Sequence, residues 1–209
     1  MVKEVAEILA NDGTTWHFIP PRMPTCGGLW EAGVQSAKRH LTRVNKDTKL
    51  TYEEMATLLA QIEACLNSRP LCQVDNTTED ILTPGHFLVG EPLVSVPDLN
   101  YEGKNINLLT RWHLIQKLTQ HFWHKWQAEY LNTLQQRHKW QRSHSSPAVG
   151  DIVIVKDEVL PPTKWLHGRI KYLHPGKDNL VRVVTIQCKG DHELKRPLYK
   201  IIPLPKDFE

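Results

Sequence analysis

Glu31 follows an unusual loop, and its carboxylate is placed where it can do chemistry. Residues 20–28 contain three prolines and two glycines, and a helix-patterned run begins at about Trp30. Proline fixes φ and glycine frees it, so the segment predicts a shaped loop that leads Glu31 into the start of a helix. Such a carboxylate is either a metal ligand in a nuclease-like site or an acid that suits a helix N-terminus. Spacing alone favours the second alternative, an acid at a helix N-terminus.

A second group of chemistry-bearing residues lies between Leu108 and Ser145. This segment has six lysines and arginines, five histidines and one acid, Glu129. Cations interleaved with aromatic rings are typical of a nucleic-acid surface, where phosphates meet the cations and bases stack on the rings. Trp123 and Trp140 fall off the apolar stripe of the expected helix and are the candidates for stacking. The rings on that stripe, expected in the core, are Trp112, Phe122, Trp126 and Tyr130.

Cysteines and histidines predict neither a disulfide framework nor a metal site. The four cysteines are scattered without a Cys-x-x-Cys pair, as expected of a reducing compartment. His121 and His124 are one helical turn apart but lack a cysteine or acid at a suitable spacing, so a metal site there is set aside.

Composition describes an ordinary soluble protein of 209 residues, with 40% hydrophobic and 23% charged residues and a net charge of +3. That charge is weak evidence for a polyanionic partner, and the local cluster above is stronger. We expect neither a leader peptide nor a membrane-spanning run. The expected location is the nucleus or the cytoplasm, without a choice between them.

Three helical runs are expected to position these residues. The first begins at Trp30, and the second begins with a capping box at Thr51–Glu54 and stops near Ser68, before Pro70. The third spans roughly Leu108 to Gln136, and residues 71–107 are expected to form an irregular connector. The expected apolar stripe of the first run is Trp30, Val34, Ala37 and Leu41. That of the second is Tyr52, Met55, Ala56, Leu59, Ile62 and Leu66.

Two short elements are expected ahead of the loop and several strands near the end of the chain. Residues 2–10 have helical spacing, and residues 15–19 alternate as a strand does. After a polar stretch at 141–147 the period becomes strand-like over 149–155, 165–174, 180–188 and, as the final strand, 194–197, which residues 199–203 follow. Short strands with turns between them, in about sixty residues, favour a small barrel.

Motifs along nearly the whole chain, in order, resemble the integrase part of Pao/BEL-type retrotransposon polyproteins. They are Trp16–Pro21, Gly27–Ala32, Ser36–Leu41, Leu58–Leu71, Leu82–Leu88, His121–Trp123, Tyr130–Leu131, Val149–Asp151, Lys164–Arg169, His174–Gly176 and Arg182–Thr185. Thr25–Cys26 departs from the His-Phe usual in that family.

The resemblance implies an RNase H-like core in which two aspartates and a glutamate hold two divalent metals, Mg²⁺ or Mn²⁺. Glu31 matches the glutamate. The matching aspartates are expected ahead of Met1, because Asp12 and Asp47 are wrongly placed to replace them. One carboxylate cannot hold two such ions. We therefore expect no catalysis by this chain alone, Glu31 as an inactive ancestral ligand, and no cofactor.

The expected fold class is α+β. The expected domains are a remnant of the integrase core at 1–70, the connector at 71–107, a basic and aromatic helical segment at 108–145, and an SH3-like β-barrel at 146–209. Lys38 lies on one helical face with Glu31, where it either contacts phosphate or belongs to a solvated face. The expected nucleic-acid-binding residues are Lys38, Arg39, Lys125, Arg137, Lys139, Arg142, Lys164 and Arg169.

The expected function is nucleic-acid binding by a non-catalytic fragment of a retrotransposon integrase. Its alternatives are a protein-interaction or chromatin-binding module, and part of an active integrase polyprotein truncated by gene prediction. Expected partners are DNA, a second copy of the chain and an upstream integrase core, with neither a membrane nor a small-molecule substrate.

Overall fold

The computed structural model covers residues 1–209 and describes residues 28–45, 48–74, 80–95, 98–105, 110–135, 147–157, 159–190 and 192–205. Two units divide the chain, Met1–Arg39 and His40–Glu209. The strand expected at 15–19 and the helix expected at 2–10 lie outside the described residues. Helices and strands both occur, which confirms the α+β class.

Helix α2 spans Gly28–Val44 and crosses the boundary between the two units. Val34 of its expected apolar stripe is 51% exposed, whereas Val44 at its end is buried. Within the larger unit, the buried His40 ring meets the edge of Phe122, and its Nε2 lies 3.0 Å from Oε2 of Glu129. The last turn of α2 is therefore fastened to the core of the larger unit.

Helix α3 spans Tyr52–Asn67 and begins with the expected capping box. The Thr51 hydroxyl accepts from the Glu54 N–H, and the Glu54 carboxylate accepts from the Thr51 N–H, so two free donors of the first turn are satisfied. The helix ends at the predicted Ser68, ahead of Pro70.

The expected apolar face of α3 is correct only in part, since Ile62 is buried and Leu66 packs against the core. Its buried side chains are Leu58, Ile62 and Cys65, whereas Tyr52 is 85% and Leu59 46% exposed. Apolar residues stand on several sides of this helix, so the period did not determine which side faces the core.

The region between α3 and α5 contains regular elements. β1 (Cys72–Gln73) pairs antiparallel with β2 (Ile81–Leu82), and the short helix α4 (Pro84–Val89) follows. Gly90, with φ of 81°, ends α4 in the left-handed conformation that glycine tolerates best.

Helix α5 spans Arg111–Leu134, and Thr110 caps its N-terminus. It packs along α3, and the two helices share one core. That core is formed by Val44, Leu58, Ile62, Cys65, Leu114, Ile115, Leu118, Phe122, Trp123 and Trp126. No helix among the described residues is long and apolar enough to cross a membrane.

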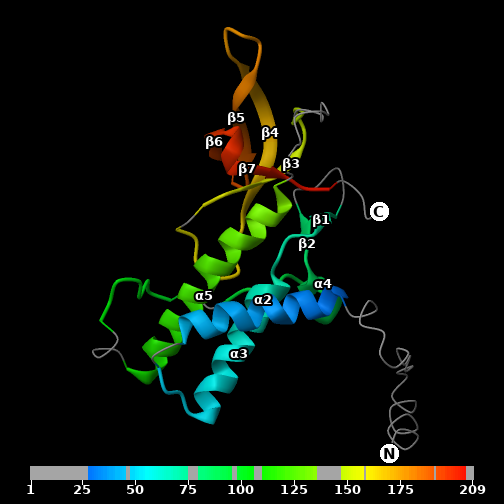
Figure 1. Ribbon diagram of the computed structural model, residues 1–209. Helices are drawn as coiled ribbons and strands as arrows, with labels where there is room; N and C mark the ends of the chain where they lie inside the picture. Colours follow the sequence, from blue (N-terminus) through cyan, green and yellow to red (C-terminus); the bar gives the residue numbers. More distant parts are fainter. Residues whose placement is uncertain are drawn as a thin grey trace, which may run out of the picture. The chain divides into compact units, whose positions relative to one another are not determined.

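The C-terminal part is a five-stranded antiparallel sheet with the order β6-β5-β4-β3-β7. Figure 1 shows its long β4–β5 hairpin, which extends beyond the residues of β4 that pair with β3. The strands are β3 (Ile152–Val155), β4 (Leu166–Pro175), β5 (Val181–Cys188), β6 (His192–Pro197) and β7 (Ile201–Pro203), with the 3₁₀ turn η3 (Leu198–Lys200) before β7. These strands agree with the expected positions to within a few residues.

Each face of this sheet has its own apolar cluster. The buried side chains of one cluster come from the strands alone and include Val153, Ile170 and Ile186. The other joins β3 and β7 to the end of α5 through contacts of Ile154, Ile202 and Leu131. Burial at these clusters stabilises the sheet and holds it against the helix.

Gly168 in β4 allows the close approach of β5. A Cβ atom at this position would lie 2.2 Å from the carbonyl oxygen of Gln187, which is a backbone atom that cannot swing away. Only glycine fits at this strand pair.

Candidate nucleic-acid interface

The outward face of α5 carries a line of cationic and titratable side chains. His113, Lys117, His121 and Lys125 follow one another at intervals of four residues, and His124 lies beside the last of them. Residues four apart stand one above another on a helix. Lys125 and His121 are exposed, and the others are partly exposed. We call these five residues the α5 stripe.

A loop at residues 98–105 is fastened beside the α5 stripe. The buried Tyr101 donates its backbone N–H to Oε1 of Gln120 at 2.9 Å, and Gln120 donates to the carbonyl of Leu99 at 2.8 Å. The Tyr101 hydroxyl donates to Asp98 at 3.0 Å. The two hydrogen bonds with Gln120 pair backbone groups of the loop with a side chain of α5, so the loop has a defined position on the helix.

Contacts between this loop and the α5 stripe bring the cation Lys104 beside the stripe. The His113 ring stacks on Tyr101 with centroids 4.9 Å apart, and the Lys104 ammonium lies 4.9 Å from the Tyr101 centroid. The ammonium group of Lys117 donates a hydrogen bond to the backbone carbonyl of Lys104. Lys104 therefore extends the stripe by one further cation.

One carboxylate of the loop opposes the stripe. Glu102 lies 3.7 Å from Nε2 of His124 and is largely exposed. The pKa of His121 lies below its ordinary value, because partial burial of its ring and the nearby Lys125 disfavour the charged form. Glu102 acts on the pKa of His121 in the opposite direction, and His124 and Lys117 reinforce the lowering.

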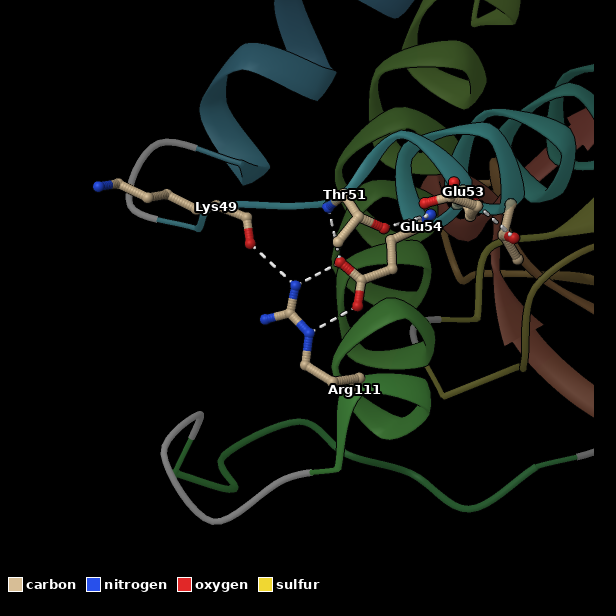
Figure 2. Close-up of polar contacts among 6 residues, drawn as sticks. Lys49, Thr51, Glu53, Glu54 and Arg111 are labelled. Carbon is tan, nitrogen blue, oxygen red and sulfur yellow. Dashed lines mark hydrogen bonds and ion pairs between the residues drawn. The ribbon is translucent and has the colours of Figure 1, made fainter.

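Arg111, at the start of α5, holds the fold together through Glu54 (Figure 2). Its Nε donates to Glu54 Oε1 at 2.6 Å, one Nη donates to the other carboxylate oxygen, and the same Nη reaches the Lys49 carbonyl at 2.9 Å. This paired geometry lowers the pKa of Glu54, chiefly through the bond from Arg111. Arg111 is therefore bound to a carboxylate of the protein, whereas Lys117 of the α5 stripe donates to a backbone carbonyl.

The described candidate residues of the larger unit belong to different segments of the chain. Lys125 belongs to the α5 stripe, Lys164 is exposed in the loop before β4, and Arg169 on β4 donates to the Gly150 carbonyl at 2.9 Å. Arg137, Lys139 and Arg142 lie outside the described residues, as does Trp140.

In the first unit, Lys38 and Arg39 are exposed on α2, and Glu31 is exposed in its first turn. An acid in that position suits the helix dipole. The described residues contain no group of three side chains that would hold a metal ion, so the described part of the chain does not fit a two-metal centre around Glu31.

Trp123 is not a stacking surface, contrary to the sequence prediction. It is 0% exposed and packs against Trp126 and Trp165 with centroids 5.9 and 4.9 Å away. Trp112, expected in the core, is 54% exposed. The expected burial of Phe122 and Trp126 is confirmed. The one exposed tryptophan of α5 among the described residues is therefore Trp112.

Two cations on the sheet are paired with nearby acids. Lys171 pairs with Glu193 at 2.5 Å, and Arg182 pairs with Asp178 at 2.5 Å. A phosphate would have to compete with these carboxylates. The α5 stripe opposes its cations with one carboxylate, Glu102, and is the stronger candidate.

Sequence reasoning singled out Lys125 but missed its neighbours on the stripe. The signal was present, since the positions 113, 117, 121 and 125 have the four-residue spacing of one helix face. Lys104 had no such signal, because only folding brings the loop to the helix.

In the comparison with known proteins, α5 and the sheet fall within one matched segment. No curated protein sequence matches the chain. Residues 110–204 match the profile of a family of unknown function, DUF5641. The matched segment contains α5 with its stripe and all five strands of the sheet, and in this segment the chain is similar to that family.

Proposed function

We propose that this chain binds nucleic acid through the α5 stripe, as a non-catalytic segment of a retrotransposon-type integrase. The observation that carries the proposal is the stripe itself, in which Lys117 and Lys125 stand on either side of His121 with Lys104 beside them. A row of cations on one helix face matches the row of charges on a phosphate backbone.

Two observations support the integrase part of the proposal. The order β6-β5-β4-β3-β7, with η3 between β6 and β7, supports the SH3-like barrel that the resemblance implies, because the last strand pairs with the first. The matched family is known in retrotransposon- and integrase-associated proteins. Both agree with the motifs that resemble Pao/BEL integrases.

The first experiment measures duplex DNA binding by the full chain, as fluorescence anisotropy at several salt concentrations. Each phosphate contact contributes a slope of about −0.9 to the plot of log affinity against log salt. The variant Lys117→Gln/Lys125→Gln is expected to bind more weakly and to reduce that slope by about two.

The matched control removes two other exposed lysines, Lys177→Gln/Lys189→Gln, which lie in turns of the sheet. Their loss is expected to leave the salt slope nearly unchanged. The proposal is wrong if the full chain fails to bind at low salt, or if both double variants weaken binding equally.

Catalysis by this chain alone is outside the proposed function. A strand-transfer assay with Mg²⁺ or Mn²⁺ is expected to give no product with this chain, and the same assay with Glu31→Gln is expected to look identical. A metal-dependent product that Glu31→Gln abolishes would restore the enzyme hypothesis.

Exposed apolar side chains favour a second candidate, self-association. Phe87, Leu88 and Val89 on α4 are 70%, 61% and 58% exposed, and neighbouring exposed apolar residues often mark a protein interface. Sedimentation velocity over a range of concentrations tests this candidate. A dimer that Phe87→Ser dissociates would support it, and a monomer at every concentration would exclude it.

A further inference from the structure

We propose that the α5 stripe takes up protons when it binds nucleic acid, through His121 and His124, so that binding tightens as the pH falls. This inference rests on the proposed function. It concerns the regulation of that site, which the presence of lysines alone does not imply.

The geometry places His121 in the middle of the cations. Lys117 is one turn before it and Lys125 one turn after it, at about 6 Å along the axis in each direction. A phosphate chain that contacts both lysines must pass over the imidazole between them. His124 lies beside Lys125 on the same face, so both rings would face the bound chain.

The groups around His121 explain why its pKa lies below the ordinary value in the free protein. From α5 it faces Lys117, His124 and Lys125, and from the loop it faces Glu102. Three groups that are or become cationic oppose one exposed carboxylate. Partial burial adds to their effect, and together they lower the pKa of His121.

A bound phosphate chain changes the electrostatic potential around His121 and His124 from positive to negative. Anionic oxygens near the rings favour the imidazolium forms, so the pKa of His121 rises on binding. By linkage, a group whose pKa is higher in the complex takes up a proton on binding, and its contribution to affinity is present at low pH and lost as pH rises. Each proton taken up changes affinity by at most about tenfold per pH unit.

The experiment uses the full chain and a fluorescent duplex DNA at pH 6.0, 7.0 and 8.0, at constant ionic strength. The affinity of the unaltered protein is expected to rise several-fold from pH 8.0 to pH 6.0. For His121→Gln/His124→Gln, most of that rise is expected to disappear, so that the ratio of the affinities at pH 6.0 and pH 8.0 approaches one.

His192→Gln is the matched control, because His192 is an exposed histidine on β6, away from α5 in sequence. It is expected to keep the full pH dependence. An NMR titration of the ring protons supplies a second readout, in which DNA raises the pKa of His121.

The two proposals fail in different ways. Absence of DNA binding at every pH, or binding only to phosphatidylserine vesicles, overturns the proposed function and this inference with it. DNA binding that is independent of pH, or a pH dependence that the double histidine variant keeps, overturns the proton uptake alone. An unchanged His121 titration in the complex does the same.

Discussion

Charged side chains of α5 divide into those that hold the fold and those that face outward. Arg111 is bound to Glu54 and to the Lys49 carbonyl, whereas Lys125 forms no ion pair with any of the described residues. The same residue type therefore has two uses on one helix, which a count of charges along the sequence does not separate.

The Glu54 carboxylate is expected to make stability depend on pH. Its pKa lies below the ordinary value of 4.5 because Arg111 and the Thr51 N–H bind the charged form. A group with a lowered folded pKa stabilises the protein above its unfolded pKa and loses that effect as pH falls through the folded value. Glu54→Gln is therefore expected to destabilise at pH 7, with a difference from the unaltered protein that shrinks below about pH 4.5.

Urea unfolding at pH 7, 5 and 3 measures this difference. Glu63→Gln, an exposed residue of the same helix, is the control and is expected to behave like the unaltered protein. A Glu54→Gln difference that stays constant down to pH 3 would show that the carboxylate charge plays no part.

Glu102 is expected to weaken nucleic-acid binding, because it is the carboxylate that faces the stripe. Glu102→Gln removes a negative charge 3.7 Å from His124 and is expected to raise DNA affinity a few-fold at pH 6 and at low salt. Anisotropy titrations with Glu91→Gln as the control, an exposed acid after α4, test this. A weaker complex with Glu102→Gln would contradict the arrangement described for the loop.

At the scale of elements, the sequence predicted which segments are helices and strands but not which helix faces are buried. The capping box at Thr51 and the proline after Ser68 are local signals, so both ends of α3 were predictable. The buried side of α3 depends on α5, and apolar residues at both 58 and 59 left the choice open. Trp123 was misplaced for the same reason, since α5 has apolar residues around much of its circumference.

Leu58 and Leu59 offer a direct test of the buried face of α3. Leu58→Ala is expected to destabilise the protein by about 2–5 kcal/mol, because it leaves a cavity in the core shared with α5. Leu59→Ala is expected to change stability by about 0.5 kcal/mol or less, since Leu59 is largely exposed. Equal losses in urea unfolding would contradict the face observed here.

In the whole of the larger unit, aromatic side chains join the helices to the sheet. Trp165, just before β4, packs against Trp123, Trp126 and Tyr130, and its Nε1 donates to the Ser68 hydroxyl at 3.2 Å. Tyr130 donates its hydroxyl to the Pro70 carbonyl at 2.6 Å, and burial raises the pKa of Tyr130 to about 12. No local sequence signal predicts these contacts, and the two hydrogen bonds join residues 60 and 97 positions apart.

The segment matched to the family is therefore not expected to fold stably without α3. A protein of residues 110–205 would expose the faces of Phe122, Trp123 and Trp126 that pack in the core shared with α3. Near-ultraviolet circular dichroism is expected to show lost tertiary packing in that piece. Residues 40–209 are expected to unfold in a single transition, and a stable 110–205 piece would contradict this dependence.

The location of DNA on the protein is the central claim, and an NMR map of backbone amide shifts tests it most directly. On addition of duplex DNA to the full chain, the largest shifts are predicted at the α5 stripe and in the loop at 98–105. They are predicted to diminish as salt is raised. Shifts confined to the β4–β5 hairpin and β6, or no shifts at low salt, would contradict the account.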